Sequence, residues 1–193
     1  GIFIMNVPND YLKIMLRFVR QGGEIALKNI NKSEPGLKAD KTIVTKTDRA
    51  VSKLARQMLA KFLKDPGHIL VDEEDPNVIE LLDQKKLEAA RYIWSVDPID
   101  GTRLYANAIP TFGISIGLLK DLKPWLGVVY FPALKELFYC DGKNSYYVQN
   151  AFVPKAKKKK IVPIDQTVTS QTTFFCNDTF FRKFNWNDPQ FHV

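Results

Sequence analysis

The stretch Trp94-Ser95-Val96-Asp97-Pro98-Ile99-Asp100-Gly101-Thr102 decides how the rest of the chain is interpreted. Residues 92–96 predict a buried strand that closes at Asp97-Pro98. The strand delivers two carboxylates, Asp97 and Asp100, and carboxylates packed this closely repel one another, at a cost that burial increases. A divalent cation removes the repulsion, because Mg²⁺ prefers oxygen ligands from a few carboxylates, water and phosphate. The stretch therefore predicts a metal site at the end of a strand.

Gly101 and Thr102 add a second feature directly after the carboxylates. If a helix begins here, its N–H groups and its dipole face the same place, which makes a seat for a phosphate oxygen. Carboxylates beside such a seat indicate metal-assisted phosphate hydrolysis, in which one metal activates water and another stabilises the leaving oxygen. The alternative is a structural turn in which Thr102 only caps the helix, and both roles can coexist.

Two further acidic sites occur upstream, each beside a strand end or a helix start. Asp48 closes Val44-Thr45-Lys46-Thr47-Asp48, and the pair Glu73-Glu74 follows the apolar residues 69–71. Asp48 has an alternative role as a simple helix cap, and Glu73-Glu74 as a solvated turn. Together with Asp97 and Asp100 they form a candidate acidic constellation.

Apolar spacing predicts two helices in the first third of the chain. The first carries one apolar face, and the second follows a predicted loop over residues 31–41, with Thr47 or Asp48 as its N-cap. A Gly22-Gly23 pair inside the first helix weakens it or marks a close approach to another element. The two faces comprise Leu12, Met15, Leu16, Val19, Gly23, Ala26 and Ile30, and Val51, Leu54, Ala55, Met58, Leu59 and Phe62.

The remainder is mostly β in character. A strand at residues 68–71 and a short polar helix within residues 77–88 precede the decisive stretch. Beyond Thr111, aromatic and β-branched residues predict strands joined by short turns, which favour antiparallel neighbours. They lie at residues 112–119, 125–131, 136–140, 145–148 and 168–176, followed by a helical turn at 178–184. The predicted fold class is α+β, or layered α/β: two N-terminal helices packed on a mostly antiparallel sheet.

Composition narrows the class of protein. The 193 residues suit one domain or slightly more, and 45% hydrophobic and 12% aromatic residues argue against global disorder. No stretch approaches the roughly 20 apolar residues of a membrane span. Two cysteines, Cys140 and Cys176, make no disulfide framework, so we expect buried thiols and a reducing, cytoplasmic location.

The net charge of +7 comes largely from one segment, Lys155-Ala156-Lys157-Lys158-Lys159-Lys160, which holds five of the lysines. Such a run is typical of a solvated loop or a charged sheet edge. It is also compatible with a contact to RNA or another anionic partner.

The decisive stretch, with Pro110, Ser115-Ile116-Gly117 and Gly127-Val128-Val129-Tyr130-Phe131-Pro132, resembles the inositol monophosphatase family. The family pattern is W-x-V-D-P-I-D-G-T, then a proline, S-I-G and G-V-V-x-x-P, and the spacing here matches it without a gap. The resemblance covers about residues 12–173.

Shorter upstream motifs extend the resemblance. Residues 44–48 resemble the family's V-T-x-x-D, and Glu73-Glu74 resembles its G-E-E, with Asp72 in place of the glycine. Lys38 resembles a basic residue that precedes V-T-x-x-D, although Lys41 is a rival.

The resemblance implies a layered αβαβα fold and Mg²⁺-dependent hydrolysis of a small phosphomonoester, foremost inositol monophosphate, in a lithium-sensitive homodimer. One alternative is a nucleotide 3′-phosphatase or sugar bisphosphatase of the same superfamily. Another is a non-catalytic member associated with RNA or transcription, whose contact would be Lys157, Lys158, Lys159 and Lys160.

The resemblance also implies roles for single residues. A first metal would bind Glu73, Asp97 and the Ile99 carbonyl, a second would bind Asp97 and Asp100, and a weaker third would bind Glu73 with water. Thr102, with Asp48 or Glu73, would orient and deprotonate the attacking water. Phosphate would bind at Asp100 and at the backbone N–H groups of Gly101 and Thr102, with Glu74 and Lys38 in support.

Three departures from the family pattern stand out. Leu104 and Tyr105 replace the usual Asn-Phe, and the turn at residues 141–144 is poor in glycine. A G-S-A-A-like helix and a W-D-x-A motif, whose Asp completes the second metal site, do not occur in the 193 residues. We therefore expect a metal-binding domain at residues 1–184 and, at 185–193, the start of a C-terminal half that is missing.

Overall fold

The computed structural model describes residues 9–32, 35–37, 43–81 and 83–162. Of these, the residues up to Ile161 belong to one compact unit. The strand predicted at 168–176 and the helical turn predicted at 178–184 lie outside the described residues.

The first predicted helix is confirmed as α2, Asp10–Asn29, which continues into a short 3₁₀ turn, η1, Ile30–Lys32. Asn9 caps it, since the Asn9 side chain accepts hydrogen bonds from the backbone N–H groups of Tyr11 and Leu12. The predicted apolar face is the buried one, which comprises Leu12, Met15, Leu16, Phe18, Val19, Gly22, Gly23 and Ala26.

The second helix is α3, Lys46–Leu59, and its predicted N-cap was wrong by two to three residues. Thr45 is the cap: its side chain accepts from the N–H groups of Thr47 and Asp48, while the Asp48 carboxylate accepts from the Thr45 N–H. This reciprocal arrangement is a capping box, which satisfies donors that a helix start leaves without partners.

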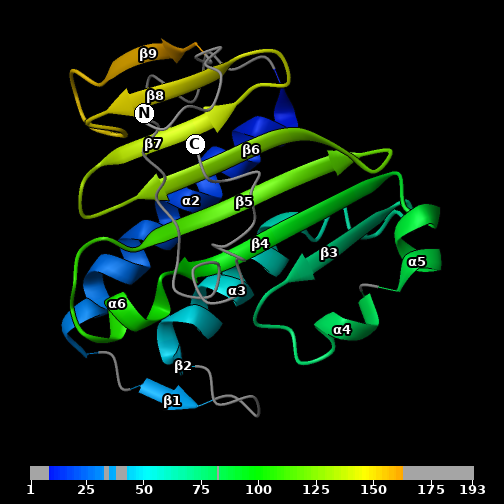
Figure 1. Ribbon diagram of the computed structural model, residues 1–193, viewed down its shortest axis with the longest axis horizontal. Helices are drawn as coiled ribbons and strands as arrows, with labels where there is room; N and C mark the ends of the chain where they lie inside the picture. The colour runs from blue at the N-terminus through cyan, green and yellow to red at the C-terminus, as the bar shows by residue number, and fades with distance from the viewer. Residues whose placement is uncertain (1–8, 33–34, 38–42, 82, 163–193) are drawn as a thin grey trace, which may run out of the picture. The chain divides into compact units, whose positions relative to one another are not determined.

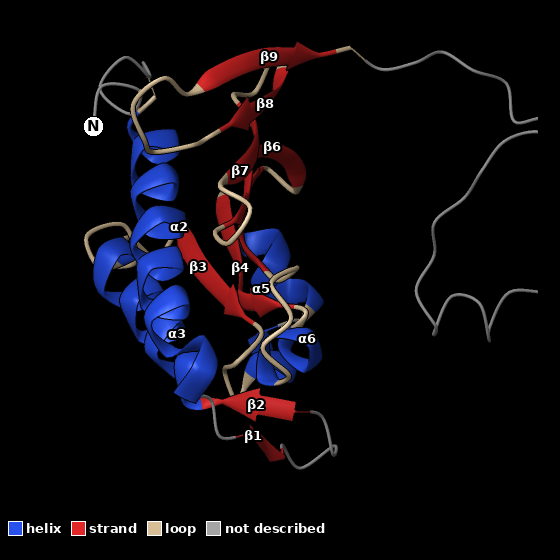
Figure 2. Ribbon diagram, turned by 90° about the vertical axis from the view of Figure 1, so that its left-hand side faces the viewer, coloured by secondary structure: helices blue, strands red, loops and turns tan. Residues whose placement is uncertain are grey.

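Among the described residues, seven strands form the main sheet, in the same order in space as in the chain (Figure 1). β3 and β4 are parallel, and every later pair is antiparallel, which confirms the predicted, mostly antiparallel sheet. Helices α2 and α3 lie together on one side of the sheet (Figure 2). The strands are β3 (His68–Asp72), β4 (Tyr92–Asp100), β5 (Gly113–Lys120), β6 (Lys123–Phe131), β7 (Glu136–Cys140), β8 (Ser145–Gln149) and β9 (Lys157–Ile161).

β4 is longer than predicted, because it does not end at Asp97-Pro98 but runs to Asp100. Proline cannot donate to a strand ladder, and the pairing of β4 with β5 shifts register between Asp97 and Asp100. Pro98 therefore lies where the ladder is interrupted anyway.

Two other connections also differ from prediction. The loop predicted at 31–41 contains a strand, β1 (Pro35–Leu37), which pairs antiparallel with β2 (Ile43–Thr45). The helix predicted within 77–88 is divided into α4 (Val78–Leu81) and α5 (Gln84–Ala89), with Asp83 as the N-cap of α5.

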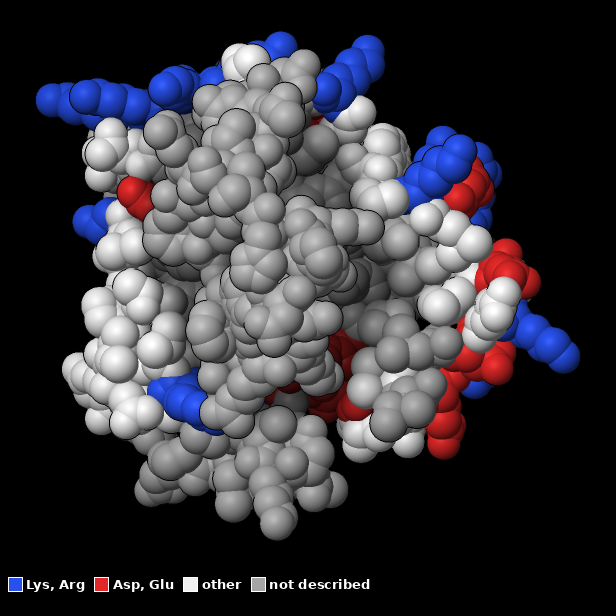
Figure 3. All heavy atoms as spheres, viewed as in Figure 1, with Lys and Arg blue, Asp and Glu red and all other residues white. Residues whose placement is uncertain are grey.

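Lys157, Lys158, Lys159 and Lys160 of the lysine run lie in β9, which is the outermost of the described strands of the sheet, and all five residues of β9 are exposed. Of the two structural alternatives, the charged sheet edge is thus confirmed. Figure 3 shows Lys and Arg side chains along this edge and acidic side chains near the end of β3.

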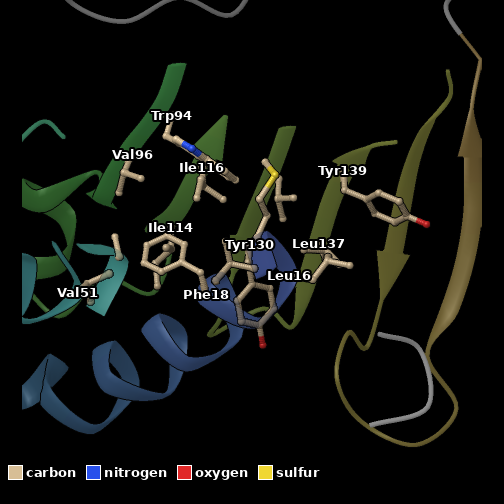
Figure 4. Close-up of a cluster of buried hydrophobic side chains, with 14 of the residues drawn as sticks. Leu16, Phe18, Val51, Trp94, Val96, Ile114, Ile116, Tyr130, Leu137 and Tyr139 are labelled. Atoms are coloured by element: carbon tan, nitrogen blue, oxygen red, sulfur yellow. The ribbon is translucent and has the colours of Figure 1, made fainter. Parts of the chain in front are cut away.

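The core lies between α2 and α3 and the sheet (Figure 4). Phe18 of α2, Val51 of α3 and Ile114 of β5 are all nearly inaccessible to solvent, as is Trp94 of β4. α3 and β4, which carry Asp48 and Asp97, therefore share one packed interior. In the part of the chain that the structure describes, no helix is both long and apolar enough to cross a membrane.

Candidate active site

The parallel pairing of β3 and β4 brings two of the acidic segments to the same edge of the sheet. Asp72, the last residue of β3, lies opposite Val96, and the Glu73 N–H donates to the Val96 carbonyl at 3.0 Å. Glu73 thus follows β3 beside the point where β4 presents Asp97. The backbone therefore places the Glu73-Glu74 turn beside the end of β4.

Asp97 is half-buried at the centre of the acidic constellation. Burial, and then the charges of Glu73, Asp100 and Asp48, raise the pKa of Asp97 from 3.8 to about 7. Its Oδ1 atom is buried and has no hydrogen-bond partner among the described residues. The negative charges of three carboxylates therefore act on a fourth, whose Oδ1 accepts no hydrogen bond from the described part of the chain. A bound cation would neutralise this concentration of negative charge.

The donor chemistry of these residues fits a hard divalent cation such as Mg²⁺, because every group concerned is an oxygen ligand. Within the described part of the chain, no three Asp, Glu, His or Cys side chains are already grouped as a metal site. The two observations are compatible, since charges act on one another over longer distances than a metal–ligand bond. The buried Oδ1 of Asp97 is the stronger sign of a cation site, because a buried carboxylate oxygen without a hydrogen bond needs a partner.

Asp48 is fully buried, and its two oxygens have different partners. Oδ2 accepts from the backbone N–H and the hydroxyl of Thr45, whereas Oδ1 lies 3.3 Å from the Thr102 hydroxyl. Burial raises the pKa of Asp48, and the hydrogen bonds from Thr45 and Thr102 offset that rise only in part. Asp48 therefore belongs to the capping box and also reaches the site.

Thr102 is the first residue of α6 (Thr102–Ala106) and is not its cap. Gly101 is the N-cap, with φ of 87°, a left-handed conformation that glycine adopts without strain, and no side chain caps the helix. The alternative in which Thr102 only caps the helix was therefore wrong. Its hydroxyl lies 3.0 Å from the Ile99 carbonyl, as well as close to Asp48, so it bridges β4 and α3.

The structure describes three more of the predicted residues, Glu74, Asp100 and Ile99. Glu74 is half-buried, and its N–H donates to Asp72 Oδ1 at 3.1 Å. Asp100 is exposed at the end of β4, and the side chain of Ile99 is 1% exposed. Lys38 lies outside the described residues.

Tyr105 is a residue whose role the sequence did not predict. Its ring is fully buried, and its hydroxyl lies 2.8 Å from the Ala26 carbonyl of α2 and 3.1 Å from the Thr47 hydroxyl of α3. The replacement of the family's phenylalanine by tyrosine was visible in the sequence, but the partners of the added hydroxyl were not. Tyr105 joins α6 to both long helices, next to Asp48.

An acidic site at the strand ends, beside the start of α6, has the ligands that metal-assisted phosphate chemistry uses. The model of the inositol monophosphatase family matches residues 9–183. The chain therefore belongs to the inositol monophosphatase family, which confirms the resemblance and the predicted fold class.

Individual relatives agree with this assignment. The chain is 30% identical to inositol monophosphatase 1 of Solanum lycopersicum, over 71% of this chain and 49% of that protein. It is 32% identical to a histidinol-phosphatase of Chlorobaculum parvum, over 72% of this chain and 51% of that protein. The chain thus spans about half the length of these relatives.

Solved structures show the same fold. A Thermotoga maritima IMPase superposes with a TM-score of 0.60 at 26% identity, covering 72% of this chain and 51% of that one. An IMPase/NADP phosphatase complexed with Mg²⁺ and phosphate gives a TM-score of 0.58 at 23% identity, covering 70% and 49%. At that identity the second likeness shows the fold alone.

Proposed function

We propose that this chain supplies the metal-binding part of a Mg²⁺-dependent phosphatase that hydrolyses a small phosphomonoester, foremost inositol monophosphate. The observation that carries the proposal is Asp97, whose buried Oδ1 has no partner among the described residues while the charges of Glu73, Asp100 and Asp48 act on it. Mg²⁺ held by such carboxylates would neutralise their charge and would also bind the oxygens of a substrate phosphate.

The residues would divide the work as follows. Glu73, Asp97 and the Ile99 carbonyl would hold one cation, and Asp97 with Asp100 a second. The bound ions would lower the pKa of water and stabilise the charge on the leaving oxygen. The amides of Gly101 and Thr102, at the start of α6, would hold phosphate oxygens with Asp100 beside them.

Thr102 and Asp48 would move the proton. The Thr102 hydroxyl accepts a proton from the attacking water as it passes its own proton to Asp48 Oδ1, 3.3 Å away. A carboxylate of raised pKa is a stronger base than an ordinary one, so the burial of Asp48 favours this transfer. Glu73 is the alternative partner of Thr102, with Glu74 and Lys38 in support.

The finer features rest on the family resemblance. They are lithium sensitivity, a homodimer, a cytoplasmic location and a division into residues 1–184 and 185–193. The alternative substrates are a nucleotide 3′-phosphate and a sugar bisphosphate. A relative that is a fructose-1,6-bisphosphatase/inositol-1-monophosphatase supports the sugar bisphosphate, and a histidinol-phosphatase relative shows that substrates differ among similar proteins.

The test is a phosphate-release panel with the 193-residue chain, combined with Mg²⁺ titration calorimetry. The substrates are inositol monophosphate, a nucleotide 3′-phosphate and fructose bisphosphate, each with Mg²⁺ and with and without Li⁺. We expect Mg²⁺ binding that Asp97→Asn abolishes, and phosphate release that falls with it. Asp121→Asn, an equal change of charge at the exposed β5–β6 turn, is the matched control. Binding and release that survive Asp97→Asn unchanged would overturn the proposal.

A non-catalytic role in contact with RNA is a second candidate, favoured by the four exposed lysines of β9. Retention on RNA should fall steeply between 50 and 200 mM salt, since lysine–phosphate contacts release counterions, by roughly a tenfold factor or more. Replacing Lys157, Lys158, Lys159 and Lys160 by serine should abolish it. Retention indifferent to salt or to these substitutions would contradict this candidate.

A further inference from the structure

The carboxylate of Asp72 accepts hydrogen bonds from three residues, and it has no part in the proposed chemistry. Asp72 is fully buried at the end of β3, one residue before Glu73. Its Oδ1 accepts from the Glu74 N–H at 3.1 Å. Its Oδ2 accepts from the Ser52 hydroxyl and, at 3.3 Å, from Arg56 Nη2, both on α3.

The same guanidinium holds the far side of the turn. Arg56 Nη2 lies 2.7 Å from Asp75 Oδ2, while Asp75 Oδ1 accepts from the Asn77 N–H at 2.8 Å. The Asp75 side chain is 13% exposed and that of Arg56 44% exposed. One arginine of α3 therefore connects to the residues on both sides of the Glu73-Glu74 turn.

The backbone of the turn is fixed on both of its edges. The Glu73 N–H donates to the Val96 carbonyl of β4 at 3.0 Å, and the Asp75 N–H donates to the Asp72 carbonyl at 3.0 Å. The Glu74 N–H, between them, is held by the Asp72 side chain. Without that carboxylate, the described contacts of the turn with α3 through Ser52 would be lost.

A buried carboxylate has a structural cost, which the other residues must offset. Burying a charge is unfavourable unless it is paired and hydrogen-bonded, and a well-packed neutral residue is often at least as stable. The family pattern has glycine at this position, which needs no such network. The ion pair of the buried Asp72 with Arg56 is therefore not explained by a gain in stability. Because Asp72 directly precedes Glu73, its hydrogen bonds can instead determine the position of Glu73.

We propose that Asp72, held by Ser52 and Arg56, is a positioning residue that fixes the Glu73-Glu74 turn on α3 and so holds Glu73 beside Asp97. Groups that orient ligands in this way commonly affect metal affinity 10-fold to 100-fold when they are removed. Only the link to the cation rests on the proposed function, since the fixing of the turn does not require a metal.

The experiment compares Asp72→Ala, Asp72→Asn and Ser52→Ala with Asp121→Asn as the control of charge. Asn keeps an oxygen for the Glu74 N–H, whereas Ala removes both oxygens. Ser52→Ala tests the contact with α3 by a milder change, should Asp72→Ala fail to fold. Each variant is measured by amide hydrogen exchange without metal, by Mn²⁺ affinity from electron paramagnetic resonance, and by thermal midpoint.

We expect Asp72→Ala to raise exchange at Glu73 and Glu74 about 10-fold and to weaken Mn²⁺ binding about 10-fold. Asp72→Asn and Ser52→Ala should both fall between Asp72→Ala and the parent chain, the first because its amide nitrogen cannot accept a hydrogen bond from Arg56. Asp121→Asn should match the parent chain. Unchanged exchange at Glu73 and Glu74 in both Asp72→Ala and Ser52→Ala would overturn the inference. So would a loosened turn with unchanged Mn²⁺ affinity.

The outcomes separate the two proposals. If the parent chain binds no Mn²⁺ while Asp72→Ala still loosens the turn, the proposed function fails and the fixing of the turn stands. If Asp72→Asn is as damaging as Asp72→Ala in both exchange and affinity, the hydrogen bond to Glu74 is not what holds the turn, and the inference fails while the proposed function stands.

Discussion

The Thr102 hydroxyl lies 3.3 Å from Asp48 Oδ1, which joins two residues 54 positions apart in the chain. The contact ties the start of α6 to the first turn of α3. One turn further along α6, the Tyr105 hydroxyl reaches the Thr47 hydroxyl at 3.1 Å, so the two helices are joined twice. Thr102 is therefore held in place rather than free to rotate, as a group that orients water must be.

Removing the Thr102 hydroxyl should lower turnover while leaving the fold intact. Thr102→Val keeps the shape but loses the proton carrier, so we expect phosphate release to fall about 100-fold or more, as for loss of a general acid–base group. Thr102→Ser keeps the hydroxyl and is the matched control, with an expected loss below about 10-fold. Steady-state phosphate release with Mg²⁺ measures the effect, and equal activity of the Val and Ser variants would contradict the role of the hydroxyl.

Much of the fold could be predicted because it depends on local patterns. The apolar spacing of α2 and α3 and the aromatic strands after Thr111 are periodic, and short turns imply antiparallel neighbours. The cap of α3 could not be placed to the residue, since Thr45, Thr47 and Asp48 all suit an N-cap. The passage of β4 through Pro98 depends on a register shift against β5, which no local pattern records.

The candidate site, like the fold, could be predicted from the sequence only in part. The acidic residues could be predicted, because carboxylates at strand ends stand out in sequence. The networks that hold them could not, since Tyr105 meets Ala26 across 79 positions and Asp72 meets Ser52 across 20. A cue did exist for Asp72: positions 68, 70 and 72 share one face of β3, and that face is buried. A carboxylate there needs partners.

The raised pKa of Asp97 predicts that stability falls with increasing pH when no metal is present. The folded state keeps a proton on Asp97 up to about pH 7, whereas the unfolded chain releases it near 3.8. Between those values the unfolded state binds fewer protons, so the free energy of unfolding decreases as pH rises. Mg²⁺ should reverse the slope, because the cation binds the ionised carboxylate.

The measurement is the thermal midpoint from pH 4 to 7.5, in EDTA and in Mg²⁺, for the parent chain and Asp97→Asn. Other carboxylates titrate in both proteins, so the difference between the two curves isolates Asp97. In EDTA, the thermal midpoint of Asp97→Asn should rise relative to that of the parent chain as the pH increases. A difference that is constant with pH would show that Asp97 ionises normally.

His68 should have the opposite dependence on pH. It is 8% exposed, and its Nδ1 accepts a hydrogen bond from Trp94 Nε1 at 3.1 Å, so this nitrogen carries no proton. Burial lowers the pKa of His68 below 6.5, although the charge of Asp65 opposes this shift. Below pH 6.5 the unfolded chain takes up a proton that the folded state does not, so stability falls as pH decreases.

The matched variant is His68→Asn, whose side-chain oxygen can take the place of Nδ1 as acceptor but does not titrate in this range. The parent chain should lose stability relative to His68→Asn between about pH 6.5 and 5 in urea unfolding. His192, the other histidine, is present in both proteins and cancels. Parallel curves for the two proteins would contradict a neutral His68.

Gly23 should be the least replaceable glycine of α2. A Cβ there would lie 2.8 Å from Tyr130 Cε1 and 3.0 Å from Pro132 Cβ, so the predicted close approach to another element is confirmed. Alanine is better than glycine inside a helix by about 1 kcal/mol, so the overlap must outweigh a real gain in helix propensity. Because overpacking in a core costs about 1–3 kcal/mol, and Pro132 and the Tyr130 ring are stiff, we expect Gly23→Ala to lower the free energy of unfolding by about 1–2 kcal/mol.

Gly127→Ala is the matched control, since a Cβ there meets nothing within 4 Å. Its free energy of unfolding should stay within about 0.5 kcal/mol of the parent value. Urea midpoints at constant slope measure both variants. If Gly23→Ala were as stable as the parent chain, the gain in helix propensity would equal the cost of the overlap. The packing of α2 against β6 would then be looser than the 2.8 Å approach to Tyr130 indicates. The tight packing of α2 on the sheet, and not the helical tendency of residues 10–29, is therefore what this pair of variants tests.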